Sequence, residues 1–139
     1  MQTLLRILRQ AGGWHHGLYL KIDNPPYMAL VIEATDESGP CGLPSISVAH
    51  YGKQNGDLMR DPEMCFELSR PAGSKLTLDS YYWRNDYMGS EQWSRQLVHG
   101  HYVMLPDLHT LHELFAAVWD GNLKSQGFEE VFTDAAIRG

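Results

Sequence analysis

Hydrophobic residues recur at helical spacing near both ends of the chain. In TLLRILRQAGG (residues 3–13) the apolar positions share one helical face, the arginines lie opposite, and two glycines supply a C-terminal stop. The segment 107–123 carries a second apolar series, which predicts a helix near 107–120 that starts at Asp107 or at a Thr110–Glu113 capping box. The apolar positions of that series are Leu108, Leu111, Phe115, Val118 and Trp119.

Between these helices, apolar and polar residues follow the alternation of β-strands. Turn residues such as Asn, Gly and Pro separate the runs, so we expect about five strands joined by short connections. The expected strands are GLYLKID (17–23), YMALVIEAT (27–35), SISVAHYG (45–52), EMCFELS (63–69) and KLTLDSYYW (75–83). SEQWSRQLV (90–98) fits a short helix or a further strand, and EEVFTDAAIRG (129–139) fits a last helical turn or a frayed end.

The order of helix, strands and helix predicts an α+β fold in two layers. An antiparallel sheet of about five strands would carry the N-terminal and C-terminal helices on one face. The chain has 139 residues, and we find no internal repeat and no linker in it, so we expect one globular domain over residues 1–139.

Composition and charge exclude several classes of protein. The chain is 43% hydrophobic, which is too high for a disordered tail. Its 11 Lys and Arg residues stand against 17 Asp and Glu residues, and the net charge of −6 argues against general nucleic-acid binding. The N-terminal segment MQTLLRILRQAGG is too short and too charged for a signal peptide, and no later segment approaches the length of a membrane span. We therefore expect a cytoplasmic protein with no membrane partner.

The two cysteines predict neither a zinc knuckle nor a disulfide. Cys41 and Cys65 do not form a CxxC pair. Cys65 lies within an apolar strand pattern and is interpreted as a small buried hydrophobic residue. The sequence indicates no cofactor.

Two polar segments are candidates for a binding surface. The stretch 51–63 is interpreted as a polar loop, and its Asn-Gly pair is typical of a tight turn. The stretch 81–89 places aromatic rings beside Arg, Asn and Asp, a composition that protein interfaces favour. If the sheet brings both segments to one edge, they form a single concave patch. The predicted binding residues are Tyr51, Asn55, Asp57, Arg60, Arg84, Asn85, Asp86 and Tyr87.

An alternative interpretation of the first segment is a metal site. Carboxylates beside one imidazole provide the ligands that divalent cations use. The candidate ligands are His50, Asp57, Asp61 and Glu63, with Asp86 as a further carboxylate. Their spacing matches no known metal-binding loop, and a solvated loop that caps its own amides is the simpler explanation of these residues.

The segment HTLHE (109–113) superficially resembles a metalloprotease helix. The HExxH motif needs a Glu directly after its first His and a second His four positions after the first, and this segment has neither. We therefore expect His109 and His112 to flank the first helical turn in solvent. The sequence also contains no nucleophile elbow and no phosphate-binding glycine loop.

Four longer segments carry a resemblance to a known group of proteins. NPPYMALVIE, ISVAHYGKQNGDLMRDPEMCFEL, RNDYMGSEQ and WDGNLKSQGF resemble a family of small bacterial proteins of unassigned function. Members of that family are commonly encoded on plasmids, integrative conjugative elements and phages. The resemblance runs from Leu4 to Phe128. It implies a cytosolic accessory protein carried by mobile DNA, and it brings no catalytic residue and no cofactor.

Three functions follow from these features. The preferred hypothesis is an accessory protein that binds another protein, such as a host protein, through the polar and aromatic patch. The alternative is a metal-dependent hydrolase or nuclease in which the carboxylates hold a cation that activates water. The third is a protein that associates with further copies of itself, that is, a homo-oligomer.

Overall fold

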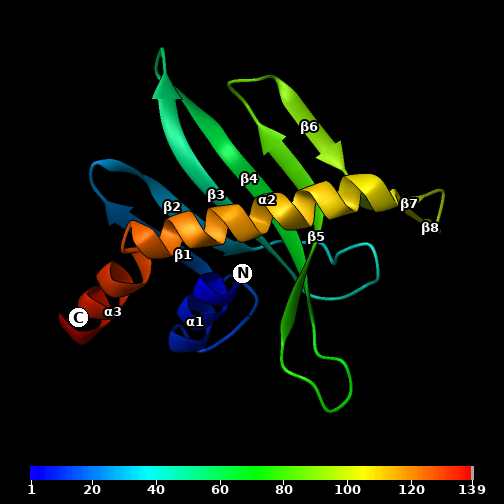
Figure 1. Ribbon diagram of the computed structural model, residues 1–139, viewed down its shortest axis with the longest axis horizontal. Helices are drawn as coiled ribbons and strands as arrows, with labels where there is room; N and C mark the ends of the chain where they lie inside the picture. Colours follow the sequence, from blue (N-terminus) through cyan, green and yellow to red (C-terminus); the bar gives the residue numbers. More distant parts are fainter. Residues whose placement is uncertain (139) are drawn as a thin grey trace.

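The structure is a computed structural model that describes residues 1–138, and it confirms the α+β class (Figure 1). Six strands form one antiparallel sheet in the order β1-β2-β3-β4-β5-β6, and two short strands form a separate hairpin, β7-β8. The helices are α1 (Gln2–Gln10), α2 (Pro106–Ser125) and α3 (Phe128–Arg138). The strands are β1 (Tyr19–Asn24), β2 (Tyr27–Ala34), β3 (Ser45–Gln54), β4 (Asp57–Ser69), β5 (Thr77–Asn85), β6 (Ser90–Trp93), β7 (Arg95–Val98) and β8 (His101–Met104).

The three helices form the second layer of the fold. Figure 1 shows α2 crossing the sheet obliquely, with α1 and α3 beside each other near its C-terminal end. The main hydrophobic core lies between this layer and the sheet, and its buried side chains come from both. They are Leu4, Ile7, Leu8, Leu18, Ile22, Leu30, Ile32, Ile46, Val48, Met64, Phe66, Leu68, Ala116, Trp119, Leu123 and Phe128.

The strand register decides which side chains face the helices. Ile46 of β3 lies opposite Phe66 of β4, and Val48 lies opposite Met64. Because successive side chains point to opposite faces of a sheet, the residues between them face away from the helices. The buried carboxylate of Glu67 is on this second face, where its Oε2 accepts hydrogen bonds from the backbone N–H groups of Cys41 and Leu43.

Several local predictions were wrong. The segment 51–63 is a strand hairpin rather than a polar loop, and its turn is confined to Asn55 and Gly56, both with positive φ. Helix α2 starts at Pro106 without a side-chain cap. Thr110 donates its hydroxyl hydrogen to the Pro106 carbonyl, and Glu113 binds Ser80, so these residues form no capping box.

The two ambiguous segments are now assigned. Residues 90–98 form strands β6 and β7 on either side of Ser94, because Trp93 of β6 pairs with Tyr82 of β5 and Arg95 of β7 pairs with Met104 of β8. The segment from Phe128 to Arg138 is a full helix rather than a frayed end, and Gly139 lies outside the described residues. Within the part of the chain that the structure describes, no helix has the length and apolar character needed to cross a bilayer.

Candidate functional site

The two polar segments of the sequence meet at one edge of the sheet. The Asn85 amide donates a hydrogen bond of 2.6 Å to Asp61 Oδ1. The Arg60 N–H donates to Asp86 Oδ2 at 2.8 Å, and the Asp86 N–H donates back to the Arg60 carbonyl at 2.8 Å. Arg84 Nε lies 2.6 Å from Asp86 Oδ1. We call these five residues, Arg60, Asp61, Arg84, Asn85 and Asp86, the edge cluster.

The polar groups of the edge cluster mainly bind each other. Burial acts to raise the pKa of Asp86, but the hydrogen bonds from the Arg60 backbone and the Arg84 guanidinium outweigh burial and hold that pKa below its usual value. Asn85 is buried, and its Oδ1 accepts a hydrogen bond from the Met88 N–H. The cluster therefore fastens β4 to the β5–β6 turn and leaves few free polar groups for a partner.

The remaining predicted binding residues do not share one surface. Asn55 and Asp57 are exposed at the tip of the β3–β4 hairpin. Tyr51 lines a hollow on the sheet face that points away from the helices. The Tyr87 hydroxyl lies on the helix side, so close to Gly52 that a Cβ there would come within 2.5 Å of it. The structure thus divides the predicted patch between two faces and a hairpin tip.

The four residues of the alternative metal site also do not converge. His50 faces the helices, and its ring centroid lies 5.5 Å from those of Trp119 and Phe128. Glu63 points to the opposite face, where its carboxylate accepts a hydrogen bond from the Ser47 hydroxyl. Asp57 is at the hairpin tip, so the prediction that these side chains share one cation was wrong.

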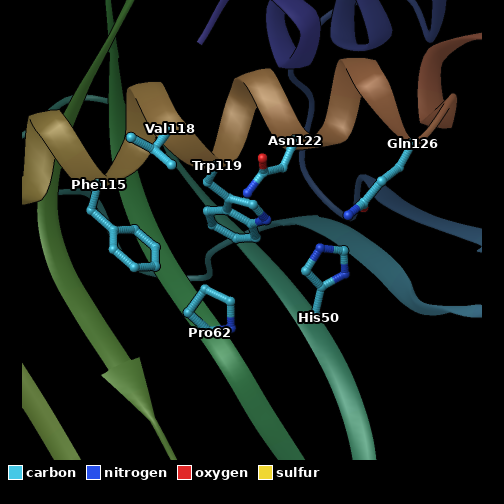
Figure 2. Close-up of a pocket in the computed structure, with 7 residues that line it drawn as sticks. All are labelled: His50, Pro62, Phe115, Val118, Trp119, Asn122 and Gln126. Atoms are coloured by element: carbon cyan, nitrogen blue, oxygen red, sulfur yellow. The ribbon is translucent and has the colours of Figure 1, made fainter.

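A cleft of about 240 Å³ opens between α2 and the sheet on the helix side (Figure 2). Phe115 and Trp119 project into it from successive turns of α2, because residues four apart share a helix face, and the exposed Val118 lines its outer rim. The sheet provides His50 from β3 and Pro62 from β4. The complete lining is His50, Pro62, Phe115, Val118, Trp119, Asn122 and Gln126.

Polar groups converge on this largely apolar cleft. His50 Nδ1 lies 3.1 Å from the Met28 carbonyl oxygen and 3.3 Å from that of Ala29. Carbonyls only accept hydrogen bonds, so Nδ1 carries the proton and Nε2 keeps its lone pair. Burial lowers the pKa of His50 and outweighs these hydrogen bonds, which favours the neutral ring.

Trp119 adds a donor to the same cleft. Its Nε1 is buried and has no hydrogen-bond partner among the described residues. Figure 2 shows the indole nitrogen on the side toward His50 and Asn122. A donor, an acceptor and two amides on apolar walls are typical of a site that binds a compact ligand group.

The buried histidines predict a stability that falls in acid. Burial lowers the pKa of His50 and of His112 from the usual 6.5, with His109 adding to the shift of His112. The unfolded chain therefore binds these protons at higher pH than the folded chain. Their contribution to stability is complete above about pH 6.5 and is lost below it, by at most about 1.4 kcal/mol per pH unit for each histidine.

Urea unfolding measured across this pH range tests the histidine contribution. The urea midpoint should fall as the pH decreases from about 7 to 5.5, and the His50→Gln variant should show a shallower fall. Equal pH dependence in the wild type and the variant would contradict the assignment of a neutral buried His50.

The outer face of α2 is also apolar. Leu111, Leu114 and Val118 are 61%, 60% and 67% exposed, and Phe115 beside them is 40% exposed. We call these four residues the α2 stripe. The sequence placed Leu111, Val118 and Trp119 in one apolar series, whereas the structure buries Trp119 and turns the other two outward. The helix thus has an apolar surface on two sides.

A second polar cluster joins the first half of α2 to β5. His109 Nε2 lies 2.8 Å from Asp79 Oδ1 and 3.3 Å from Glu113 Oε1, and these are groups that hold metal ions. His112 is buried and contacts Gln92, so the prediction that both histidines lie in solvent was wrong. The spacing of His109 and Glu113 signals a shared helix face, but the sequence does not reveal Asp79.

The fold and the cleft together define a two-layer α+β protein with a ligand-sized opening between its layers. A family model described as Domain of unknown function (DUF6908) matches residues 2–129, and the chain belongs to this family. Comparison with curated proteins and with solved structures finds no match. The resemblance noted in the sequence is thus confirmed as far as a family of unassigned function.

Proposed function

We propose that the protein is a small binding protein that engages another protein through the α2 stripe and the adjoining cleft. The proposal keeps the binding function inferred from the sequence and moves its surface from the predicted polar and aromatic patch to α2. Service to a mobile genetic element in a bacterial cytoplasm is part of the proposal and rests on the sequence resemblance alone.

The observation that carries the proposal is the exposure of the α2 stripe. A contiguous patch of large exposed apolar side chains often marks an interaction site, whereas single exposed apolar residues are common on any protein surface. Complete burial of one such side chain contributes about 1.5–3 kcal/mol, so covering Leu111, Leu114 and Val118 favours association strongly. Phe115 and Val118 belong to both the stripe and the cleft lining, which makes the apolar surface continuous.

The cleft gives this surface a specific anchor point. An apolar side chain of the partner would pack against Phe115 and Val118, and a polar group at its end would meet the Trp119 N–H and His50 Nε2. Such central pockets commonly carry most of the binding energy of an interface. The net charge of −6 favours a partner with a neutral or basic contact surface.

Affinity capture with two matched variants tests the proposal. Val118→Glu places a charge in the stripe, and Ala117→Glu places the same charge on the neighbouring exposed position, about 100° around the helix. Proteins captured from bacterial lysate by the wild type should be lost with Val118→Glu and kept with Ala117→Glu. A purified partner should then bind Val118→Glu at least about tenfold more weakly, or roughly 1.4 kcal/mol.

Two results would go against this proposal. Equal binding by both variants would remove the stripe from the interface. Sedimentation of the purified wild type as a dimer that Val118→Glu dissociates would show that the stripe joins two copies of this chain instead of a different protein.

A further inference from the structure

The structure assigns a divalent metal site to Asp79, His109 and Glu113, at the other end of α2 from the cleft. The three side chains offer one imidazole nitrogen and two carboxylate oxygens, which all lie within 4.8 Å of one another. His109 and Glu113 are four residues apart on α2, so they share a face, and Asp79 reaches them from β5. The site is independent of the proposed binding function.

The distances fit a small transition-metal ion. Zinc binds nitrogen and oxygen ligands at about 2.0–2.2 Å, so two ligands of a tetrahedral ion lie about 3.3–3.5 Å apart. His109 Nε2 lies 3.3 Å from Glu113 Oε1 and 2.8 Å from Asp79 Oδ1. A small outward movement of the Asp79 side chain therefore completes a three-ligand set. Asp79 and Glu113 are 43% and 40% exposed, which leaves room for water as a fourth ligand.

Neighbouring groups orient the two carboxylates. Ser80 donates to Glu113 Oε1 from its backbone N–H at 3.0 Å and from its hydroxyl at 2.7 Å. Arg95 Nη2 lies 3.4 Å from Asp79 Oδ2, the oxygen that does not contact His109. Metal ligands are commonly fixed by such outer contacts, which determine ligand orientation and affinity.

The charges of the group favour a divalent cation. Arg95 is buried between two carboxylates, with Nη1 2.7 Å from Glu67 and Nη2 close to Asp79. Arg95 thus shares its charge between Glu67 and Asp79, and Glu113 adds a third carboxylate beside His109. The three carboxylates together carry two more negative charges than the one guanidinium balances. A divalent ion neutralises them.

The ligand types identify the class of metal. An imidazole together with carboxylates suits zinc and its transition-metal neighbours, whereas magnesium and calcium prefer oxygen ligands alone. The simpler account of the same contacts is a hydrogen-bonded tether between α2 and β5. The metal site and the tether respond differently when the carboxylates are made neutral. Only metal binding requires the negative charges of Asp79 and Glu113.

Calorimetric titration with zinc chloride distinguishes the two accounts. Glu113→Gln and Asp79→Asn each keep a carbonyl oxygen that accepts the existing hydrogen bonds, so the tether is retained and the fold is preserved. We expect one zinc ion per wild-type chain and a loss of affinity of more than about 100-fold in each variant, since even outer-contact changes cost 10–100-fold. His101→Gln, which changes an exposed histidine of β8, should bind like the wild type.

Cobalt substitution provides a second measurement that does not depend on heat signals. Bound Co²⁺ should show the visible absorption of four-coordinate cobalt in the wild type and in His101→Gln, and lose it in Glu113→Gln. Unchanged zinc affinity in both carboxylate variants would place the binding on other histidines and overturn the assignment. Absence of binding at millimolar zinc would overturn it as well.

Discussion

Replacing Arg95 with methionine is expected to lower the free energy of unfolding by about 3–5 kcal/mol, because removing one partner leaves a buried charge unpaired. Arg95 is 1% exposed and lies 2.7 Å from Glu67, which is equally buried. Its other donors bind the backbone carbonyls of Asp79 and Ser80. The substitution therefore leaves one carboxylate and two carbonyls with fewer partners in the interior.

The Glu67 side chain cannot move out to water easily. Its Oε2 accepts the N–H groups of Cys41 and Leu43, and Gly39 packs so closely that an added Cβ would lie 2.1 Å from Glu67 Cγ. Thus Arg95 and Glu67 together hold the segment before β3 against the sheet.

Arg6→Met is the matched control for this experiment. Arg6 pairs with Glu129 at 2.7 Å, but its side chain is 40% exposed, and solvent screens exposed pairs so that they contribute little to stability. Chemical unfolding of both variants measures the difference. If Arg95→Met loses no more stability than Arg6→Met, the Arg95–Glu67 pair does not hold the fold as described.

Replacing Phe128 with alanine is expected to lower the free energy of unfolding by about 3–5 kcal/mol, the range observed for buried aromatic residues. Phe128 is fully buried at the start of α3. Its ring centroid lies 5.5 Å from that of His50 and 6.3 Å from that of Tyr27. The change leaves a cavity between α3 and the first three strands, and the cavity adds to the cost of the lost apolar contacts.

Phe115→Ala is the same change at a position that is 40% exposed. It removes less buried surface, so we expect less than half of the loss measured for Phe128→Ala. The midpoint of urea unfolding, determined for both variants under the same conditions, gives the comparison. Similar losses in the two variants would show that Phe128 contributes no more than a surface ring.

Apolar spacing predicted where the helices lie but not which side of a helix is buried. The period of 3.6 residues located α1 and α2 because it follows from backbone geometry. In α2, however, both Trp119 and Val118 fit an apolar face, and the sequence did not show which of them turns inward. The sheet decides this point, because the side that carries His112, Ala116 and Trp119 is buried, with β5 in contact with α2 and His50 of β3 against Trp119.

The arrangement of the polar residues depended on contacts between distant segments even more than the burial of α2 did. Sequence patterns placed Arg60, Arg84 and Asp86 in two polar segments, and the β4–β5 pairing brought these residues together. The same pairing lets these charged side chains bind each other. The polar composition of the two segments does not reveal this. The carboxylate of Asp79 and the ring of His109 are likewise separated by 30 positions and meet only across the two layers.

The sequence by itself determined the α+β class, most of the strands and the helical ends, because these follow from local periodicity and turn residues. The tertiary structure alone decided which side of α2 is buried, how the edge cluster is paired and where the cleft opens. The reason is physical: local patterns depend on neighbours within a few residues, whereas burial and charge pairing depend on contacts between distant segments.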